Sequence, residues 1–282
     1  MVAKILDGKL TSQNLLEKLQ TKVANYTNKP VLAILLVGEN PASTIYVNAK
    51  LKKAKDIGFQ TVFTQLKDNA TEEEILSQIE IWNKDNSIHG ILVQLPLPKH
   101  IDKNKILNAI TPIKDVDGLT TYNSGLFYTS QQPYAIPCTT RGIIMLLEEY
   151  GINVEGKHAV VIGRSNLVGK PTAQALLQKN ATVTTCHSKT QNFESIIKTA
   201  DIVISAVGEK IVNGKILKNK CIVIDVGIFR TPEGKISGDV EFESASQVAE
   251  YISPVPGGVG PMTVIALMYN LLDLYLKQNN IK

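Results

Sequence analysis

The first part of the chain alternates between helical and strand patterns of apolar positions. Residues 11–27 and 41–56 show helical periodicity, and the second segment lies between a capping Asn40 and a closing Gly58. Between the two helices, the continuous apolar run "VLAILLV" (31–37) has the length of a buried strand. Such a run bounded by helices is typical of a parallel sheet with both faces covered.

The alternation continues to about residue 98. The segment "FQTVFTQL" (59–66) predicts a strand, and residues 71–84 predict a helix that starts at a Thr71–Glu74 capping box. The segment "HGILVQLPLP" (89–98) predicts a strand that ends at its prolines. Helices alternating with strands indicate βαβ units, and hence an α/β fold.

Residues 111–138 lack helical periodicity. Prolines and glycines recur along this stretch. We therefore expect a long irregular segment that ends at a domain boundary, and long loops of this kind often carry function.

A second α/β pattern follows this segment. It predicts helices near 139–150 and 169–179, and strands at 158–162, 181–186, 201–207 and 221–227. The segment "SPVPGGVGP" (253–261) is incompatible with a helix or a central strand, and a closing helix is expected from Met262 to Lys277. We expect this last helix to pack back on the first domain.

Composition narrows the function classes. The chain has 282 residues, 44% of them hydrophobic, and a formal net charge of +4, without the dense basic stripe of a nucleic-acid-binding protein. Three widely spaced cysteines and four scattered histidines show no metal-ligand spacing and favour a reducing, cytoplasmic setting. The N-terminus does not resemble a signal peptide, and no apolar run approaches the roughly 20 residues of a membrane span.

The segment "VVIGRSNLVGKP" (160–171) resembles a dinucleotide-binding turn. Gly163 follows an apolar strand and is placed to form the tight turn, while Ser165 stands where a second glycine is usual. Gly169 is displaced by one residue, and the helix after it would direct its N-terminus at a phosphate. An ordinary connection between a strand and a helix has the same glycines, so the turn alone leaves both interpretations open.

The next strand discriminates between the two nicotinamide cofactors. NAD sites usually place an acidic residue after this strand, but here it ends in "CHSKT", without a carboxylate. The 2′-phosphate of NADP carries roughly one and a half to two negative charges. Arg164, Ser188 and Lys189 would attract that phosphate, so we predict NADP. The alternative is that Arg164 is a solvated loop residue.

One helix carries a candidate catalytic pair. Tyr46 and Lys50 are four residues apart and share a helix face. Gln94 interrupts an apolar strand, and a buried amide needs hydrogen-bond partners. If Gln94 meets Lys50, the lysine would be partly desolvated and able to exchange protons near neutral pH. A solvated lysine on a helix surface is the alternative.

Two carboxylates in "IKDVDGLT" lie in the irregular stretch. Asp115 and Asp117 precede a glycine, and such residues often do no more than build a turn. A functional carboxylate would instead accept hydrogen bonds from amino and ring N–H groups of a ligand. The spacing does not decide between the two.

Taken together, ten segments resemble the bifunctional methylenetetrahydrofolate dehydrogenase/cyclohydrolase family, in the order that the family shows. They span about residues 5–275 and read "VGENPASTIYVNAKLKKAKDIG", "GILVQLPLP", "KDVDGLT", "PCTTRGI", "VVIGRSNLVGKP", "ATVTTCHSKT", "DIVISAVG", "VIDVGI", "GDVEF" and "SPVPGGVGPMTVIALMYN". No single segment would be specific, but ten in order are.

The resemblance implies two α/β domains with the active cleft between them. Residues 1–138 and 264–282 would form the folate-binding catalytic domain, and residues 139–263 a Rossmann-like NADP-binding domain that also makes most of a homodimer interface. The family oxidises 5,10-methylenetetrahydrofolate with NADP to the 5,10-methenyl cation. It then hydrolyses that cation to 10-formyltetrahydrofolate, which supplies one-carbon units, for example to purine biosynthesis.

The resemblance also implies residue roles. Lys50 would be the key lysine of the hydrolysis, Gln94 would tune it, Tyr46 would border the folate, and Asp117 would bind the pterin. The implied substrate-binding positions are Tyr46, Lys50, Val93, Gln94, Leu95, Asp117, Pro256, Gly257, Gly258, Pro261 and Thr263. The implied cofactor-binding positions are Gly163, Arg164, Ser165, Ser188 and Ile228. No metal is expected.

One departure and three rival functions remain at this point. The family often has "PCTPKG" where this chain has "PCTTRG", with Thr140 and Arg141. The proline is lost in the linker between the domains, so the property in question is domain opening. The rivals are a dehydrogenase-only relative, a two-domain NADP dehydrogenase of the shikimate type, and a dinucleotide-binding sensor without turnover.

Overall fold

The computed structural model describes residues 2–232 and 234–281, and the chain forms two compact units. Unit 1 comprises residues up to 13 and 139–263, and unit 2 comprises residues 14–138 and 264 onward. The predicted division into a folate-binding and an NADP-binding domain, with residues 1–13 in the former, stays a prediction. Strand β1 (Lys4–Ile5) pairs in parallel with β11 (Tyr251–Ile252), and this pairing joins the N-terminal segment to the sheet of unit 1.

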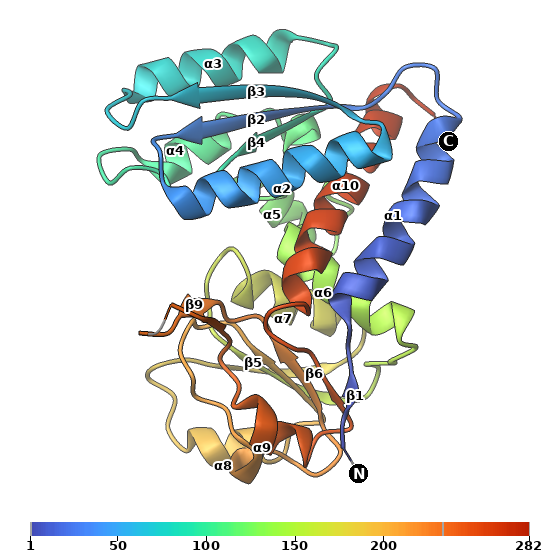
Figure 1. Ribbon diagram of the computed structural model, residues 1–282, viewed down its shortest axis with the longest axis vertical. Coiled ribbons are helices and arrows are strands. Elements are labelled where there is room, and N and C mark those ends of the chain that lie inside the picture. Colours follow the sequence, from blue (N-terminus) through green and yellow to red (C-terminus); the bar gives the residue numbers. More distant parts are fainter. Residues whose placement is uncertain (1, 233, 282) are drawn as a thin grey trace. The chain divides into compact units, whose positions relative to one another are not determined.

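Unit 2 is built on a parallel sheet in the order β3-β2-β4 (Figure 1). The strands are β2 (Val31–Val37), β3 (Gln60–Leu66) and β4 (Gly90–Val93). Every residue of β2 is buried, as expected for a central strand covered on both faces. Strand β4 ends at Val93, so Gln94 and the prolines after it lie beyond the strand, and the predicted extent of 89–98 is too long.

Helices cover both faces of this sheet. The helices of unit 2 are the greater part of α1 (Gly8–Ala24), α2 (Pro41–Ile57), α3 (Glu72–Lys84), α4 (Lys103–Asn108), α5 (Thr121–Tyr128) and the greater part of α10 (Val259–Gln278). Figure 1 shows α3 and α2 on opposite sides of the sheet. The alternate β2 residues Val31, Ala33, Leu35 and Val37 share one apolar cluster with α3 and α4. The other β2 side chains point to the opposite face.

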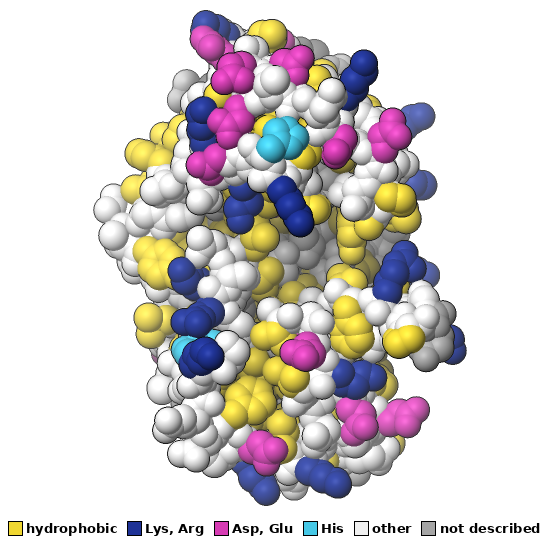
Figure 2. Space-filling view, turned by 90° about the vertical axis from the view of Figure 1, so that its left-hand side faces the viewer, with side chains coloured by type: hydrophobic (Ala, Val, Ile, Leu, Met, Phe, Trp, Pro, Cys, Tyr) yellow, Lys and Arg dark blue, Asp and Glu magenta, His cyan; other side chains and the backbone are white. Residues whose placement is uncertain are grey.

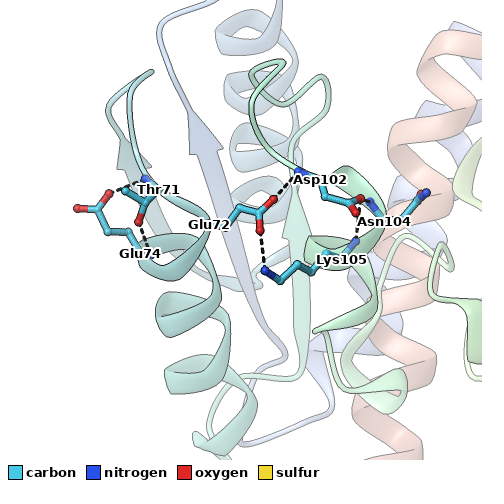
Figure 3. Close-up of polar contacts among 6 residues, drawn as sticks. All are labelled: Thr71, Glu72, Glu74, Asp102, Asn104 and Lys105. Atoms are coloured by element: carbon cyan, nitrogen blue, oxygen red, sulfur yellow. Dashed lines mark hydrogen bonds and ion pairs between the residues drawn. The ribbon is translucent and has the colours of Figure 1, made fainter.

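The helix caps confirm what the sequence predicts. The Asn40 side chain accepts hydrogen bonds from Ala42 and Ser43 N–H, and Gly58 closes α2 in the left-handed conformation. Thr71 and Glu74 form the predicted capping box of α3 (Figure 3). Each cap satisfies backbone groups that the helix itself leaves unpaired, so local sequence alone determines where these helices begin.

Figure 3 also shows how α3 is tied to α4. Glu72 accepts a hydrogen bond from Asp102 N–H and pairs with Lys105 Nζ at 2.6 Å. Asp102 in turn caps α4 through the N–H groups of Asn104 and Lys105. Figure 2 shows acidic side chains gathered among lysines and arginines at the upper end of the view. These charged groups are exposed, and the Glu72 contacts link α3 to α4 on the surface of unit 2.

The segment 111–138 is less irregular than expected. It contains a 3-10 helix η1 (Pro112–Lys114) and helix α5, which Thr120 caps through the Asn123 N–H. Asn123 is fully buried, and its amide bridges Pro112 O and the Asp115 carboxylate. This polar anchoring, rather than an apolar stripe, holds α5, which explains why its helical periodicity is absent from the sequence.

Unit 1 contains a six-stranded parallel sheet in the order β1-β11-β8-β7-β5-β6. The strands not yet given are β5 (His158–Ile162), β6 (Thr182–Cys186), β7 (Ile202–Ser205) and β8 (Ile222–Asp225). Its helices are α6 (Cys138–Glu149), α7 (Gly169–Gln178), α8 (Phe193–Ile197), η2 (Gly214–Ile216) and α9 (Phe242–Ser246). A hairpin of β9 (Phe229–Arg230) and β10 (Ile236–Ser237) projects after β8.

The order of the sheet in unit 1 is that of an open α/β fold. After β1, the chain returns to this sheet at β5, moves to β6 on one side and then crosses to β7 on the other side. The order therefore reverses next to β5, and ligands of such sheets bind at this switch point, outside the carboxyl ends of the strands. The four predicted strands are confirmed, and the two-residue strands β1 and β11 are too short to show a pattern.

Helix α10 corrects two expectations. It begins at Val259, so the last three residues of "SPVPGGVGP" form its first turn, where a proline is tolerated. It is also 20 residues long with a mean hydropathy of 1.4, which is enough to cross a membrane by length and composition. However, 61% of that window is buried, and Asn270 inside it bonds Val116 O and Ile136 O. These features identify it as a core helix.

Candidate active site

The structure brings Lys50 and Gln94 together within unit 2. Lys50 Nζ donates a hydrogen bond of 2.9 Å to Gln94 Oε1, which is the contact on which the catalytic interpretation of Lys50 depends. The Gln94 amide nitrogen donates to Leu95 O at 2.7 Å, so this side chain, only 8% exposed, is bonded at both ends. The amide therefore has one orientation, with its oxygen toward Lys50 Nζ. Gln94 thereby holds the lysine side chain next to the end of β4.

Tyr46 and Asp117 have polar groups that the protein leaves available. Tyr46 lies one helical turn before Lys50 and is 43% exposed, and Asp117 is partly buried. In the part of the chain that the structure describes, neither side chain makes a hydrogen bond to another residue. Polar groups held on an ordered framework without internal partners are typical of ligand-binding positions.

The Asp115 carboxylate shapes the loop that carries Asp117. It is 1% exposed and accepts hydrogen bonds from Leu119 N–H, Thr120 N–H and the Asn123 amide. Burial raises the pKa of Asp115 above its usual value, and the three hydrogen-bond donors oppose that increase only in part. Asp115 also forms a parallel β-bridge with Ile91, which places the start of the loop that carries Asp117 beside β4. Of the two carboxylates, Asp115 therefore builds the turn.

Other predicted substrate positions differ in exposure and in location. Val93 is 3% exposed and belongs to the apolar cluster under the sheet, and Leu95 packs partly buried against that cluster. The predicted residues 256–263 belong to unit 1. There Gly257 has a φ of 106°, and its carbonyl accepts a hydrogen bond from Lys9 N–H.

The glycine turn has the geometry that a dinucleotide site requires. Gly163 has a φ of 116°, which a side chain rarely adopts, and its N–H donates to Cys186 O at 2.9 Å. A methyl group on Gly169 would lie 2.2 Å from Gly163 O, so only glycine lets α7 approach the turn this closely. Gly169 therefore takes the role of the third glycine, despite its displacement.

Ser165 replaces the second glycine for an identifiable reason. Its Oγ accepts hydrogen bonds from Val168 N–H at 3.1 Å and Gly169 N–H at 3.4 Å. The side chain thus satisfies the first amides of α7 in the way that a capping residue does. The turn keeps its shape through this hydroxyl.

Arg164 and Ser188 follow adjacent strands. Ile162 pairs with Cys186 in the β5–β6 register, so the residues after each strand leave the sheet at the same edge. Arg164 and Ser188 are exposed, and the His187–Thr190 turn between β6 and α8 contains no carboxylate. Ile228, after β8, is 48% exposed. This edge offers cationic and hydroxyl groups to an anion.

Two functional candidates were missed in the sequence. Asp225, the last residue of β8, and Asp239, two residues after β10, are 4% and 0% exposed. Burial, with the charge of Asp239 as a further cause, raises the pKa of Asp225 to about 6. The available signal was an acidic residue ending an apolar strand in "CIVIDVG". Among the described residues, no group of three or more His, Cys, Asp or Glu side chains could hold a metal ion.

Comparison with known proteins identifies the family. The model of the tetrahydrofolate dehydrogenase/cyclohydrolase catalytic domain matches residues 6–117, and that of the NAD(P)-binding domain matches residues 137–279. The chain belongs to the tetrahydrofolate dehydrogenase/cyclohydrolase family. The bifunctional protein FolD of Streptococcus pyogenes serotype M28 is 48% identical over 272 residues, which are 95% of each chain.

Solved structures of the tetrahydrofolate dehydrogenase/cyclohydrolase family share the fold. The bifunctional enzyme FolD from Campylobacter jejuni is 43% identical with a TM-score of 0.94, and the match covers 98% of this chain and 99% of that one. The Trypanosoma brucei enzyme, complexed with NADP cofactor and inhibitor, is 36% identical with a TM-score of 0.93 and 98% coverage of both chains. Both α/β units, including the C-terminal NAD(P)-binding domain, are therefore those of this family.

Proposed function

We propose that the protein oxidises 5,10-methylenetetrahydrofolate to 5,10-methenyltetrahydrofolate with NADP, and then hydrolyses the product to 10-formyltetrahydrofolate. The observation that carries this proposal is the hydrogen bond between Lys50 and Gln94, at the end of β4, in a chain that matches both domains of the family. A shikimate-type dehydrogenase or a nucleotide sensor would not need this pair, so the family match favours the bifunctional enzyme.

The residues of unit 1 fit NADP. Gly163 and Gly169 leave space for a close approach to the start of α7, because a methyl group on Gly169 would collide with the backbone. Arg164 and Ser188 would hold the 2′-phosphate, and no carboxylate follows β6 to repel it. Ser165 and Ile228 would line the rest of the site. When bound, the oxidised nicotinamide supplies a hydride acceptor.

Hydride transfer does not require a strong acid or base from the protein. The nitrogen lone pairs of the folate stabilise the cation as the hydride leaves, so the residues mainly have to hold and orient the folate. Tyr46 would border its ring, and Asp117 would accept hydrogen bonds from the pterin N–H groups. The availability of both side chains, which make no internal hydrogen bonds among the described residues, supports these roles.

Hydrolysis requires a group that moves protons near the attacking water. Lys50 is the candidate, because its ammonium is fixed by Gln94 and is not neutralised by a carboxylate in the described contacts. The Lys50 amine would accept a proton from the water that adds to the methenyl carbon and return it to the nitrogen released as the ring opens. The remaining hydroxyl proton would leave to solvent as the formyl carbonyl forms. Gln94 would set the direction of the lysine side chain.

Further binding positions complete the proposal. We assign substrate contacts to Val93, through its backbone because its side chain is buried, and to Leu95. We also assign substrate contacts to Pro256, Gly257, Gly258, Pro261 and Thr263 of unit 1. We expect a homodimer formed largely through unit 1, which light scattering would test, and a cytoplasmic enzyme, which the three free, buried cysteines support. Neither a nucleic acid nor a membrane is expected as a partner.

One assay tests the main proposal. Purified protein is given methylenetetrahydrofolate and NADP, and the absorbance of NADPH and of the methenyl product is followed together. NADPH formation without accumulation of the methenyl compound is expected. Absence of NADPH would refute the proposal, and methenyl decay only at its spontaneous rate would indicate the dehydrogenase-only relative.

A further inference from the structure

Two buried carboxylates lie at the edge of unit 1 where parallel sheets bind ligands. Asp225 ends β8, and Asp239 follows β10 by two residues. Their exposures of 4% and 0% place both carboxylates inside the protein, where each needs hydrogen-bond donors. The residues that supply those donors show what the two side chains do.

The Asp239 carboxylate holds the end of β7 and the loop after it. Oδ2 accepts hydrogen bonds from Ser205 Oγ at 2.8 Å and Val207 N–H at 2.7 Å, and Oδ1 accepts one from Glu209 N–H at 2.9 Å. All three donors lie between the last residue of β7 and residue 209. One side chain therefore determines the path of residues 206–209.

The Asp225 carboxylate holds the backbone that carries Asp239. Its Oδ1 accepts hydrogen bonds from Asp239 N–H at 2.9 Å and Gly227 N–H at 3.0 Å, and its Oδ2 accepts one from Val240 N–H at 3.0 Å. The two carboxylates therefore act in series. Asp225 positions the chain at residues 239–240, and Asp239 positions the loop 206–209.

The surrounding glycines leave room for these carboxylates. A methyl group on Gly227 would lie 1.8 Å from Asp239 Oδ1, and one on Gly238 would lie 2.1 Å from Asp225 Oδ2. Neither collision is with a flexible chain end, because both carboxylates are held by several bonds. The loops are thus built around the two side chains.

The loop that Asp239 holds flanks the switch point of the sheet. Strand β7 is the neighbour of β5 on the side where the strand order reverses, and Ile162 pairs with Ser205 at the carboxyl ends. A methyl group on Gly163 would lie 2.7 Å from Ala206 O, so the glycine turn and the loop 206–209 are in contact. A dinucleotide bound at this switch point would meet both segments.

We propose that Asp239, itself held by Asp225, is a positioning residue for NADP that keeps the loop 206–209 in the shape that receives the nucleotide. Its own oxygens are occupied by Ser205, Val207 and Glu209, so it acts through the loop and does not touch the ligand. The inference rests on the proposed NADP site of unit 1 and adds to it a determinant that lies outside the glycine turn.

The test measures NADPH binding by fluorescence titration in the wild-type protein and in Asp239→Asn. The amide turns one acceptor into a donor that faces backbone N–H groups, so we expect NADPH affinity to fall at least about tenfold. Hydrogen exchange of the free protein should become faster at the Val207 and Glu209 amides. Hydrolysis of methenyltetrahydrofolate, which needs no nucleotide, should keep its wild-type rate.

Asp201→Asn is the matched control. Asp201 also accepts a backbone hydrogen bond, from His158 N–H, and pairs with Lys218, but it lies before β7 at the opposite edge of the sheet. Its replacement should leave NADPH affinity unchanged. If Asp239→Asn does not fold, Ser205→Ala removes a single donor to the same carboxylate and should still weaken NADPH binding and speed exchange at Val207.

The outcomes separate this inference from the proposed function. If the wild-type protein binds NADPH and folded Asp239→Asn binds it equally well, the positioning role is refuted while the proposed function stands. An equal loss of NADPH binding and hydrolysis would also refute it, since that pattern indicates general destabilisation. A wild-type protein without affinity for NADPH would overturn the proposed function and this inference together.

Discussion

Lys50 Nζ lies 2.9 Å from Gln94 Oε1 and donates a hydrogen bond to it, which joins a residue in the middle of α2 to the residue that follows β4. The two positions are 44 residues apart in the sequence. Because the Gln94 amide is itself held by Leu95 O, the lysine points in a defined direction from a rigid base. This relationship fixes the direction of the Lys50 amine in unit 2, the unit that also carries Asp117.

Lys50→Met should abolish hydrolysis while the folate still binds. Proton transfer by a positioned side chain contributes about a hundredfold or more, and methionine has a similar length without a proton to share. The decay of methenyltetrahydrofolate absorbance measures the rate, and calorimetry measures folate binding. Lys55→Met, an exposed position on the same helix, is the control. Full hydrolase activity in Lys50→Met would contradict the assigned role.

Arg164→Ala should weaken NADP binding far more than NAD binding, because only NADP carries the 2′-phosphate. A lost hydrogen bond between charged groups corresponds to a decrease of about tenfold to a hundredfold in affinity. Dissociation constants for both nucleotides provide the measurement. Lys198→Ala removes an exposed charge that precedes β7, toward the other edge of the sheet, and should change neither constant. Equal losses for NADP and NAD would show that Arg164 has another role.

Asp115→Asn should raise the KM for the folate substrate while NADPH affinity stays constant. The amide would place N–H groups against the Leu119 and Thr120 amides, so the loop that presents Asp117 would shift. We expect a KM increase of about tenfold, and a loss of unfolding free energy of about 2 kcal/mol. Asp102→Ala removes an exposed helix cap in the same unit and should cost stability without changing KM. An unchanged KM in Asp115→Asn would exclude this positioning role.

The stability of the protein should decrease as the pH rises from about 4 to about 6, to the extent that Asp225 determines it. Burial raises the pKa of Asp225 from 3.8 to about 6, so the folded protein holds this proton more tightly than the unfolded chain does. The contribution reaches about 3 kcal/mol, since one pKa unit corresponds to about 1.4 kcal/mol. Denaturant titrations of the wild type and of Asp225→Asn at several pH values measure it. Parallel curves for the two proteins would rule it out.

Much of the fold could be predicted because short sequence patterns determine many of its helices, strands and turns. The buried run 31–37, the Asn40 and Thr71 caps and the glycine turn each act over a few residues, and the structure confirms them. Helix α5 and strands β1 and β11 were not predictable in the same way. Helix α5 is anchored by polar bonds from Asn123 to Pro112 and Asp115, which leave no apolar period in the sequence. Residues 4–5 find their parallel partner at the other end of the chain, and a two-residue strand has no period to detect.

The candidate site divides in the same manner. The sequence by itself determined the candidate groups, namely a lysine, an amide and a carboxylate proposed for the folate, and an arginine and a serine without a nearby acid proposed for the nucleotide. Only the tertiary structure decided which carboxylates remain without internal hydrogen bonds among the described residues and which are internal supports. Asp115 and Asp239 lie outside the predicted helices and strands, and Asp225 lies in a predicted strand, yet each is buried and bonded to backbone N–H groups. The physical reason is that the role of a carboxylate depends on which donors surround it, and the folded chain supplies these from several segments.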